Sequence, residues 1–146
     1  LDAELLHLMK AAGCNGIWLG LESVTDSVLE TNKKGTSQKQ LIECISLLKE
    51  TDISFNVFFM IGMPGETKES LNALYEFMVK YKLPCTKSFM VCTPRYGTKM
   101  YELAEQEHPL AFDDFHNLNE WKGLIGNYIS QEDIQATIHR LSNLLD

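Results

Sequence analysis

Two features of this chain could do chemistry: a carboxylate and hydroxyl that follow one apolar run, and a glycine-rich turn that follows another. Glu22 and Ser23 come directly after the apolar residues 16–21. A carboxylate in that position can accept hydrogen bonds from the hydroxyl or ammonium groups of a ligand. The second feature begins at Ile61 and contains Gly62, Pro64 and Gly65. Glycines let a ligand approach the main chain and proline stiffens the turn, although a tight turn without a ligand is equally compatible with this sequence.

A third polar segment follows the apolar run at residues 88–92. It begins with Thr93 and Pro94. Each of the three runs is followed by a helical pattern, and parallel βα units place all such loops at one end of the sheet. We therefore expect the three segments to converge, with Glu66 supporting the start of the helix after the glycine turn.

Cysteines and histidines give no metal or disulfide pattern. The four cysteines have no Cys-x-x-Cys spacing, and the four histidines are isolated from one another. Cys44 falls on an apolar helix face and Cys92 in a strand, so we expect both to be small core residues.

The strands and helices that must position these residues are predicted from hydrophobic periodicity and from helix-capping residues. Residues 16–23, 53–62 and 87–92 are expected to form adjacent parallel strands in an α/β fold. Helical spacing predicts helices before, between and after them, including a short one at 98–106 and an irregular segment at 107–130. Their predicted N-caps are Asp2, Ser37 (with Gln40 in a capping box), Thr67 and Ser130. The first helix is expected to bury Leu5, Leu8, Met9 and Ala12.

Composition restricts the function classes. The chain has 146 residues, 45% of them hydrophobic, which suits one globular domain. A net charge of −7 argues against a nucleic-acid surface. No apolar run approaches the roughly 20 residues of a membrane span, and the first residues are no signal peptide, so a cytoplasmic setting is expected.

Taken together, the motifs resemble the later half of a radical S-adenosylmethionine (radical SAM) domain, in the subgroup with cobalamin-dependent enzymes and magnesium-protoporphyrin ester cyclase-like proteins. The resemblance runs over residues 1–106. The matching residues are Leu5, Leu6, Leu8, Met9, Lys10, Ala12, Gly13, Cys14, Ile17, Leu19, Gly20, Leu21, Glu22, Ser23, Val28, Leu29, Asn32, Lys33, Lys34, Gly35, Phe59, Ile61, Gly62, Pro64, Gly65, Glu66, Thr67, Thr93, Pro94, Gly97, Thr98 and Tyr101.

The resemblance implies a six-stranded partial (βα) barrel, of which residues 1–106 would form strands four to six and residues 107–146 a C-terminal loop and helix extension. In that family S-adenosylmethionine chelates a [4Fe–4S] cluster and is cleaved reductively to a 5′-deoxyadenosyl radical, which abstracts hydrogen from a small-molecule substrate. Cobalamin would bind through another domain.

Residue by residue, the resemblance assigns cofactor contacts to three strand ends. Glu22 and Ser23 would face the ribose or the methionine ammonium. The turn of Ile61, Gly62, Pro64 and Gly65 would receive the adenine or ribose, and Thr93 and Pro94 would border the cofactor or substrate. Val24 and Tyr96 depart mildly from the family pattern, which often has glycine and proline there.

The large departure is that no Cys-x-x-x-Cys-x-x-Cys motif occurs in the chain. We therefore expect a fragment that is inactive by itself, whose partner is the N-terminal half-barrel of the same protein and whose uncovered surfaces favour self-association. The alternative is a cluster-free α/β module that binds another small ligand or a protein.

Overall fold

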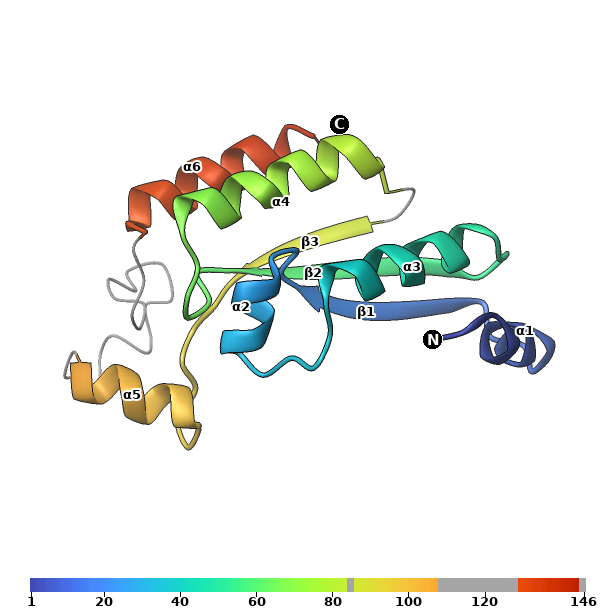
Figure 1. Cartoon of the computed structure of the whole chain (residues 1–146), viewed down its shortest axis with the longest axis horizontal. Coiled ribbons are helices and arrows are strands. Elements are labelled where there is room, and N and C mark those ends of the chain that lie inside the picture. The colour runs from blue at the N-terminus through green and yellow to red at the C-terminus, as the bar shows by residue number, and fades with distance from the viewer. Residues whose placement is uncertain (84–85, 108–128, 145–146) are drawn as a thin grey trace.

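The computed structural model describes residues 1–83, 86–107 and 129–144. Three strands form one sheet in the order β1-β2-β3, and both pairings are parallel (Figure 1). The strands are β1 (Gly16–Glu22), β2 (Ser54–Ile61) and β3 (Thr86–Val91). The predicted adjacent parallel strands are confirmed.

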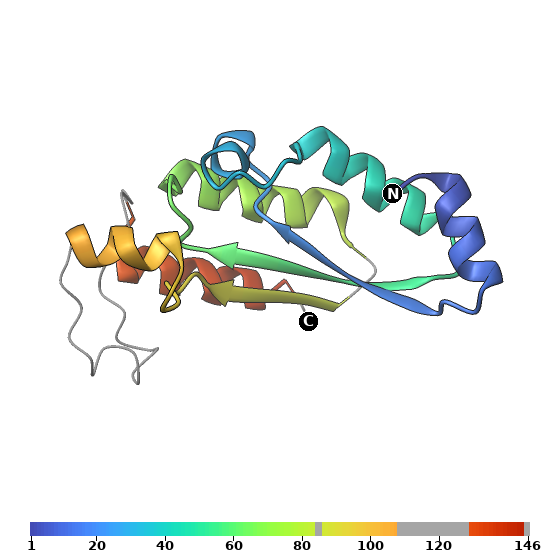
Figure 2. The ribbon, with the colours of Figure 1, turned by 90° about the horizontal axis from the view of Figure 1, so that it is seen from below.

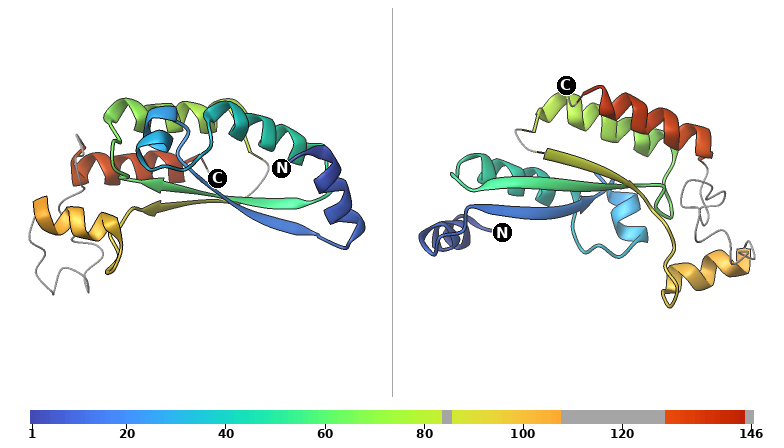
Figure 3. Two further views of the ribbon diagram at one scale, coloured as in Figure 1. Left: turned by 60° about the horizontal axis from the view of Figure 1, so that its bottom comes forward. Right: turned by 180° about the vertical axis from the view of Figure 1, so that it is seen from behind.

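Helices cover one face of this sheet. Helices α3 and α4 lie over it, and α6 packs against α4 beside β3 (Figures 1 and 2). Seen from behind, β1 and β2 have no described helix in front of them (Figure 3, right); we call this side the open face. The helices are α1 (Ala3–Ala11), α2 (Asp26–Thr31), α3 (Gln38–Lys49), α4 (Lys68–Tyr81), α5 (Lys99–Glu107) and α6 (Gln131–Ser142).

Burial alternates along β2, because successive side chains of a strand point to opposite faces. The side facing the helices carries four buried residues, Phe55, Val57, Phe59 and Ile61. Phe59 pairs with Phe89 of β3, and their rings stack with centroids 5.7 Å apart. The side chains of the open face are only partly covered, and Trp18 and Met90 are 74% and 54% exposed.

The predicted helix starts are confirmed. The Asp2 carboxylate accepts the Leu5 N–H at 2.8 Å, and capping boxes begin the three longest helices. Each such cap stabilises its helix by about 1 kcal/mol. The capping boxes join Ser37 to Gln40, Thr67 to Ser70, and Ser130 to Asp133.

The predicted face of α1 is wrong. Its buried residue is Leu6, which is fully covered, whereas Leu5 and Leu8 are 44% and 58% exposed. Helical spacing alone allowed two faces, and the packing of α1 at the amino end of β1 selects the one that carries Leu6 (Figure 1).

The short helix expected at 98–106 after β3 is confirmed as α5 (Lys99–Glu107). Helix α5 lies beyond the carboxyl ends of the strands, away from the layer of α3 and α4 (Figure 3), and α6 instead packs beside β3. Most of the irregular segment expected at 107–130 lies outside the described residues. No helix in the described ranges has the length and apolar character needed to cross a bilayer.

Candidate functional site

The carboxyl ends of the three strands meet, as predicted. The Cys92 N–H, just after β3, donates to the Ile61 carbonyl at the end of β2 at 2.8 Å. A small buried apolar cluster adjoins this contact. It consists of Val28 of α2, Met63 and Cys92. The ends of β2 and β3 and helix α2, which follows β1, are therefore packed together rather than merely facing the same direction.

Glu22 ends β1 in an unusual conformation. Its φ of 65° lies in the left-handed region, and the pairing of β1 with β2 shifts register between Gly20 and Glu22. A Cβ built on Gly20 would lie 2.5 Å from the Glu22 Oε1 atom. Gly20 alternates with Leu21 and Leu19, which face the helices, so the Glu22 carboxylate folds back over Gly20 on the open face.

Among the described residues, Lys34 is the charged partner of the Glu22 carboxylate. Lys34 Nζ lies 3.2 Å from Glu22 Oε1, and the two side chains are 33% and 20% exposed. A left-handed backbone costs a non-glycine residue about 1–2 kcal/mol, and an ion pair at this exposure contributes about 1 kcal/mol or less. The stabilisation from the ion pair does not exceed the cost of the left-handed backbone. The conformation of Glu22 is therefore not explained by a gain in folding stability.

Ser23 is buried, with 4% of its surface exposed. Its Oγ atom accepts the Thr25 N–H at 3.3 Å, and its own N–H donates to the Leu21 carbonyl at 2.8 Å. The Ser23 hydroxyl thus supports the turn from β1 into α2. The structure does not bring it onto the open face beside Glu22.

The turn after β2, residues 62–65, is called the glycine loop below. Gly62 and Gly65 have φ values of 84° and 82°, which L-residues rarely adopt. A Cβ at Gly65 would also lie 3.1 Å from the Thr31 Oγ1 atom at the end of α2. The Pro64 carbonyl accepts the Asn32 Nδ2 group at 2.8 Å. The glycine loop is therefore fixed against the end of α2.

Glu66 does not support the start of α4, and that expectation is wrong. Its side chain is 2% exposed and turns back into the glycine loop, where it accepts the backbone N–H of Gly62 and of Met63. Burial raises the pKa of Glu66 to about 7, and these two hydrogen bonds partly oppose the rise. The start of α4 is capped by Thr67 and Ser70 without it.

After β3, Thr93 is partly exposed and Pro94 is buried. The Thr93 hydroxyl donates to the Val91 carbonyl at 3.3 Å. Cys92 is buried as expected, while Cys44 is only partly covered. Burial, together with the nearby charges of Glu66 and Glu22, raises the pKa of the Cys92 thiol to about 11.

The described residues contain no group of three or more histidine, cysteine or acidic side chains that could hold a metal ion. What the strand ends offer instead is a carboxylate on the open face and a glycine loop. A carboxylate binds hydroxyl or ammonium donors, and a glycine-rich backbone admits a flat group at close range. The carboxylate can thus bind a ligand that carries hydroxyl or ammonium donors.

Three residues of the site were matched to the family pattern in the sequence but were given no role there. Gly20 leaves room for the Glu22 carboxylate, Lys34 pairs with it, and Asn32 ties α2 to the glycine loop. For Gly20 the sequence held a usable signal, because a glycine two residues before a carboxylate at the end of a strand can leave room for that carboxylate. The contacts of Lys34 and Asn32 depend on how α2 turns back, which no local pattern specified.

Comparisons with known proteins identify the family of this chain. The Radical SAM superfamily matches residues 1–78. The chain is 32% identical over 103 residues to an uncharacterized methyltransferase of Pyrococcus horikoshii, with 70% of this chain and 22% of that protein covered. It is 33% identical over 106 residues to the anaerobic magnesium-protoporphyrin IX monomethyl ester cyclase of Cereibacter sphaeroides, with 72% and 17% covered.

A third relative is a methylthiotransferase. The chain is 27% identical over 120 residues to a ribosomal protein uS12 methylthiotransferase of Protochlamydia amoebophila, with 79% of this chain and 25% of that protein covered. The chain thus spans about a quarter or less of the length of these three relatives. Because the family match covers more than half of its residues, the chain belongs to the radical SAM superfamily.

Proposed function

We propose that this chain supplies part of the S-adenosylmethionine site of a radical SAM iron–sulfur enzyme. The observation that carries the proposal is the Glu22 carboxylate, which lies over Gly20 on the open face at the carboxyl end of β1. Left-handed backbone at a functional position is a recognised way to aim a side chain. Family membership supports the same reading.

In this proposal Glu22 accepts hydrogen bonds from the ribose hydroxyls or the methionine ammonium group. Ile61, Gly62, Pro64 and Gly65 receive the adenine or ribose along their backbone, and Thr93 and Pro94 border the same space. Ser23 acts behind Glu22, because its hydroxyl is engaged in the turn to α2. When bound, the cofactors supply reductive cleavage of the sulfonium and hydrogen abstraction from a small-molecule substrate.

We further propose that β1, β2 and β3 are the fourth to sixth strands of a six-stranded barrel. On this reading residues 1–106 are its second half and residues 107–146 an extension. The other half, with the cluster ligands, would belong to the same protein, consistent with the relatives being several times longer.

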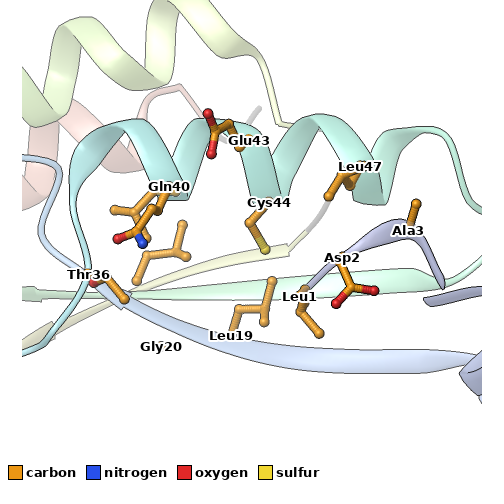
Figure 4. Close-up of a pocket in the computed structure, with 12 residues that line it drawn as sticks. Leu1, Asp2, Ala3, Leu19, Gly20, Thr36, Gln40, Glu43, Cys44 and Leu47 are labelled. Carbon is orange, nitrogen blue, oxygen red and sulfur yellow. The ribbon is translucent and has the colours of Figure 1, made fainter. Parts of the chain in front are cut away.

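A groove beside β1 supports this part of the proposal. A groove of about 460 Å³ runs between α3 and the edge strand β1, where Leu19 and Cys44 face each other (Figure 4). Its wall also includes the apolar side chains of Leu1, Leu41 and Leu47. We propose that a preceding strand and helix of the barrel pair with β1 and cover this groove, since an unpaired edge strand needs a neighbour.

The test uses the full-length protein with its cluster reconstituted anaerobically. We expect Glu22→Gln to weaken S-adenosylmethionine binding about ten- to a hundredfold by calorimetry, because one hydrogen bond to a charged group is lost. Glu76→Gln, an exposed carboxylate on α4 that does not line the groove, is the control and should bind as wild type does. Equal binding by wild type and Glu22→Gln would contradict the assignment.

A further inference from the structure

The charged end of Lys34 shares the open face with Glu22. A Cβ on Gly20 would lie 2.5 Å from Glu22 Oε1 and 3.6 Å from Lys34 Nζ. Both charged groups therefore lie over the same glycine. Gly20 lies on the edge strand β1 and pairs with Phe58 of the central strand β2, so the ion pair lies over the sheet near the carboxyl end of β1.

The backbone around Lys34 is fixed from two sides. The Lys34 N–H donates to the Leu29 carbonyl at 2.9 Å, which closes the end of α2. Next to it, the Asn32 Nδ2 group donates to the Pro64 carbonyl of the glycine loop at 2.8 Å. Left-handed backbone at Lys33 (φ 52°) then turns the chain toward α3. Lys34 thus lies in a turn that is hydrogen-bonded to the glycine loop, which the cofactor is proposed to contact.

The two oxygens of the Glu22 carboxylate differ. Oε1 accepts a hydrogen bond from Lys34 at 3.2 Å, whereas Oε2 accepts none from the described residues. A carboxylate free to rotate would present either oxygen to a ligand. With Oε1 held, the rotation is restricted and Oε2 is the oxygen that remains for a ligand donor.

We propose that Lys34 is the positioning residue of Glu22: it holds Oε1 so that Oε2 is directed to a hydroxyl or ammonium donor of the bound ligand. This inference rests on the proposed function. An ion pair this exposed contributes little to folding, which leaves orientation of the carboxylate as its main effect. Lys34 acts through Glu22, so its effect must disappear when Glu22 can no longer be oriented in this way.

The experiment is a double-mutant cycle on S-adenosylmethionine binding by the full-length protein, measured by calorimetry. Lys34→Met is expected to weaken binding about three- to tenfold, and Lys34→Arg to restore most of that loss. Lys33→Met is the matched control, because Lys33 is the adjacent exposed lysine and should bind as wild type. In a Glu22→Gln background, Lys34→Met should add less than a twofold further loss.

Thermal unfolding of each variant separates positioning from folding, and the Lys34 variants should melt close to wild type. If Lys34→Met binds as wild type while Glu22→Gln is weakened, or if the two losses multiply in the double variant, the inference is wrong and the proposed function stands. If Glu22→Gln itself binds as wild type, the assignment of Glu22 and the role of Lys34 fail together. If Lys34→Met does not fold, the same binding measurement is made on Lys34→Arg, alone and combined with Glu22→Gln, and this comparison takes its place.

Discussion

The side chain of Glu66 closes the glycine loop by accepting the backbone N–H of Gly62, four residues before it. It also accepts the N–H of Met63, and it is almost fully buried. The loop is therefore organised around a carboxylate that no solvent reaches. Because burial favours the uncharged acid, the pKa of Glu66 rises to about 7 from 4.5.

This raised pKa predicts a pH dependence of stability. In the unfolded chain the carboxyl ionises near pH 4.5, whereas in the folded chain it does so near pH 7. The contribution of Glu66 is fully present below pH 4.5 and is lost as the pH rises through 7. The expected loss is about 3 kcal/mol in the free energy of unfolding, at about 1.4 kcal/mol per pKa unit.

Glu66→Gln should remove that loss, so its stability relative to wild type should rise between pH 4.5 and 7.5. Chemical denaturation at several pH values measures the difference. Glu76→Gln, an exposed position of α4, is the control and should follow wild type throughout. A Glu66→Gln curve parallel to that of wild type would show that Glu66 is not titrating in this range.

Gly20→Ala tests whether ligand binding requires the Glu22 carboxylate to lie in the space over Gly20. The added Cβ would lie 2.5 Å from the Glu22 carboxylate, which is the far end of a flexible side chain and can move away. We expect stability to change by less than about 1 kcal/mol, while S-adenosylmethionine binding in the full-length protein falls about as much as for Glu22→Gln. Gly16→Ala, on the same face of β1 but away from Glu22, should leave binding unchanged.

The open face predicts association of the 146-residue chain by itself. Trp18 and Met90 expose large apolar surfaces there, and exposed apolar patches promote self-contact. Sedimentation at increasing concentration should show dimers or larger species, and Trp18→Ser with Met90→Ser should shift the distribution toward monomer. The control pair is Leu5→Ser with Leu8→Ser on α1, which lies outside the open face.

Anaerobic reconstitution of the same chain with iron and sulfide should give no stoichiometric [4Fe–4S] cluster. Cluster iron needs closely arranged thiolates. Of the described cysteines, Cys14 lies between α1 and β1, Cys44 lies in α3, and Cys92 follows β3. Iron and sulfide analysis with visible spectroscopy is the measurement. Stoichiometric iron together with S-adenosylmethionine cleavage would overturn the view that this chain lacks the cluster site.

Much of the fold could be predicted because its signals are local. Apolar runs marked the strands, and capping residues such as Ser37 and Thr67 marked the helix starts. The face of α1 could not be predicted, since Leu5 and Leu6 both suit a helical stripe and only packing distinguishes them. The role of α6 depends on a long-range contact with α4, which local periodicity does not encode.

For the site, the positions of residues along the chain predicted which of them lie near one another. They did not predict how the side chains are oriented. Strand ends identified Glu22 and the glycine loop as neighbours. The inward turn of Glu66 and the pairing of Glu22 with Lys34 both depend on backbone in left-handed or turn conformations. Such contacts are settled by the tertiary structure around them.

Cys92 stands between the glycine loop and Glu22, where burial and two neighbouring carboxylates hold its thiol pKa at about 11. At neutral pH only about one thiol in ten thousand would be ionised, and it is the thiolate that binds metals and reacts with oxidants. The Cys92 thiol is thus almost entirely protonated at neutral pH. Alkylating reagents should therefore spare Cys92 until the fold opens.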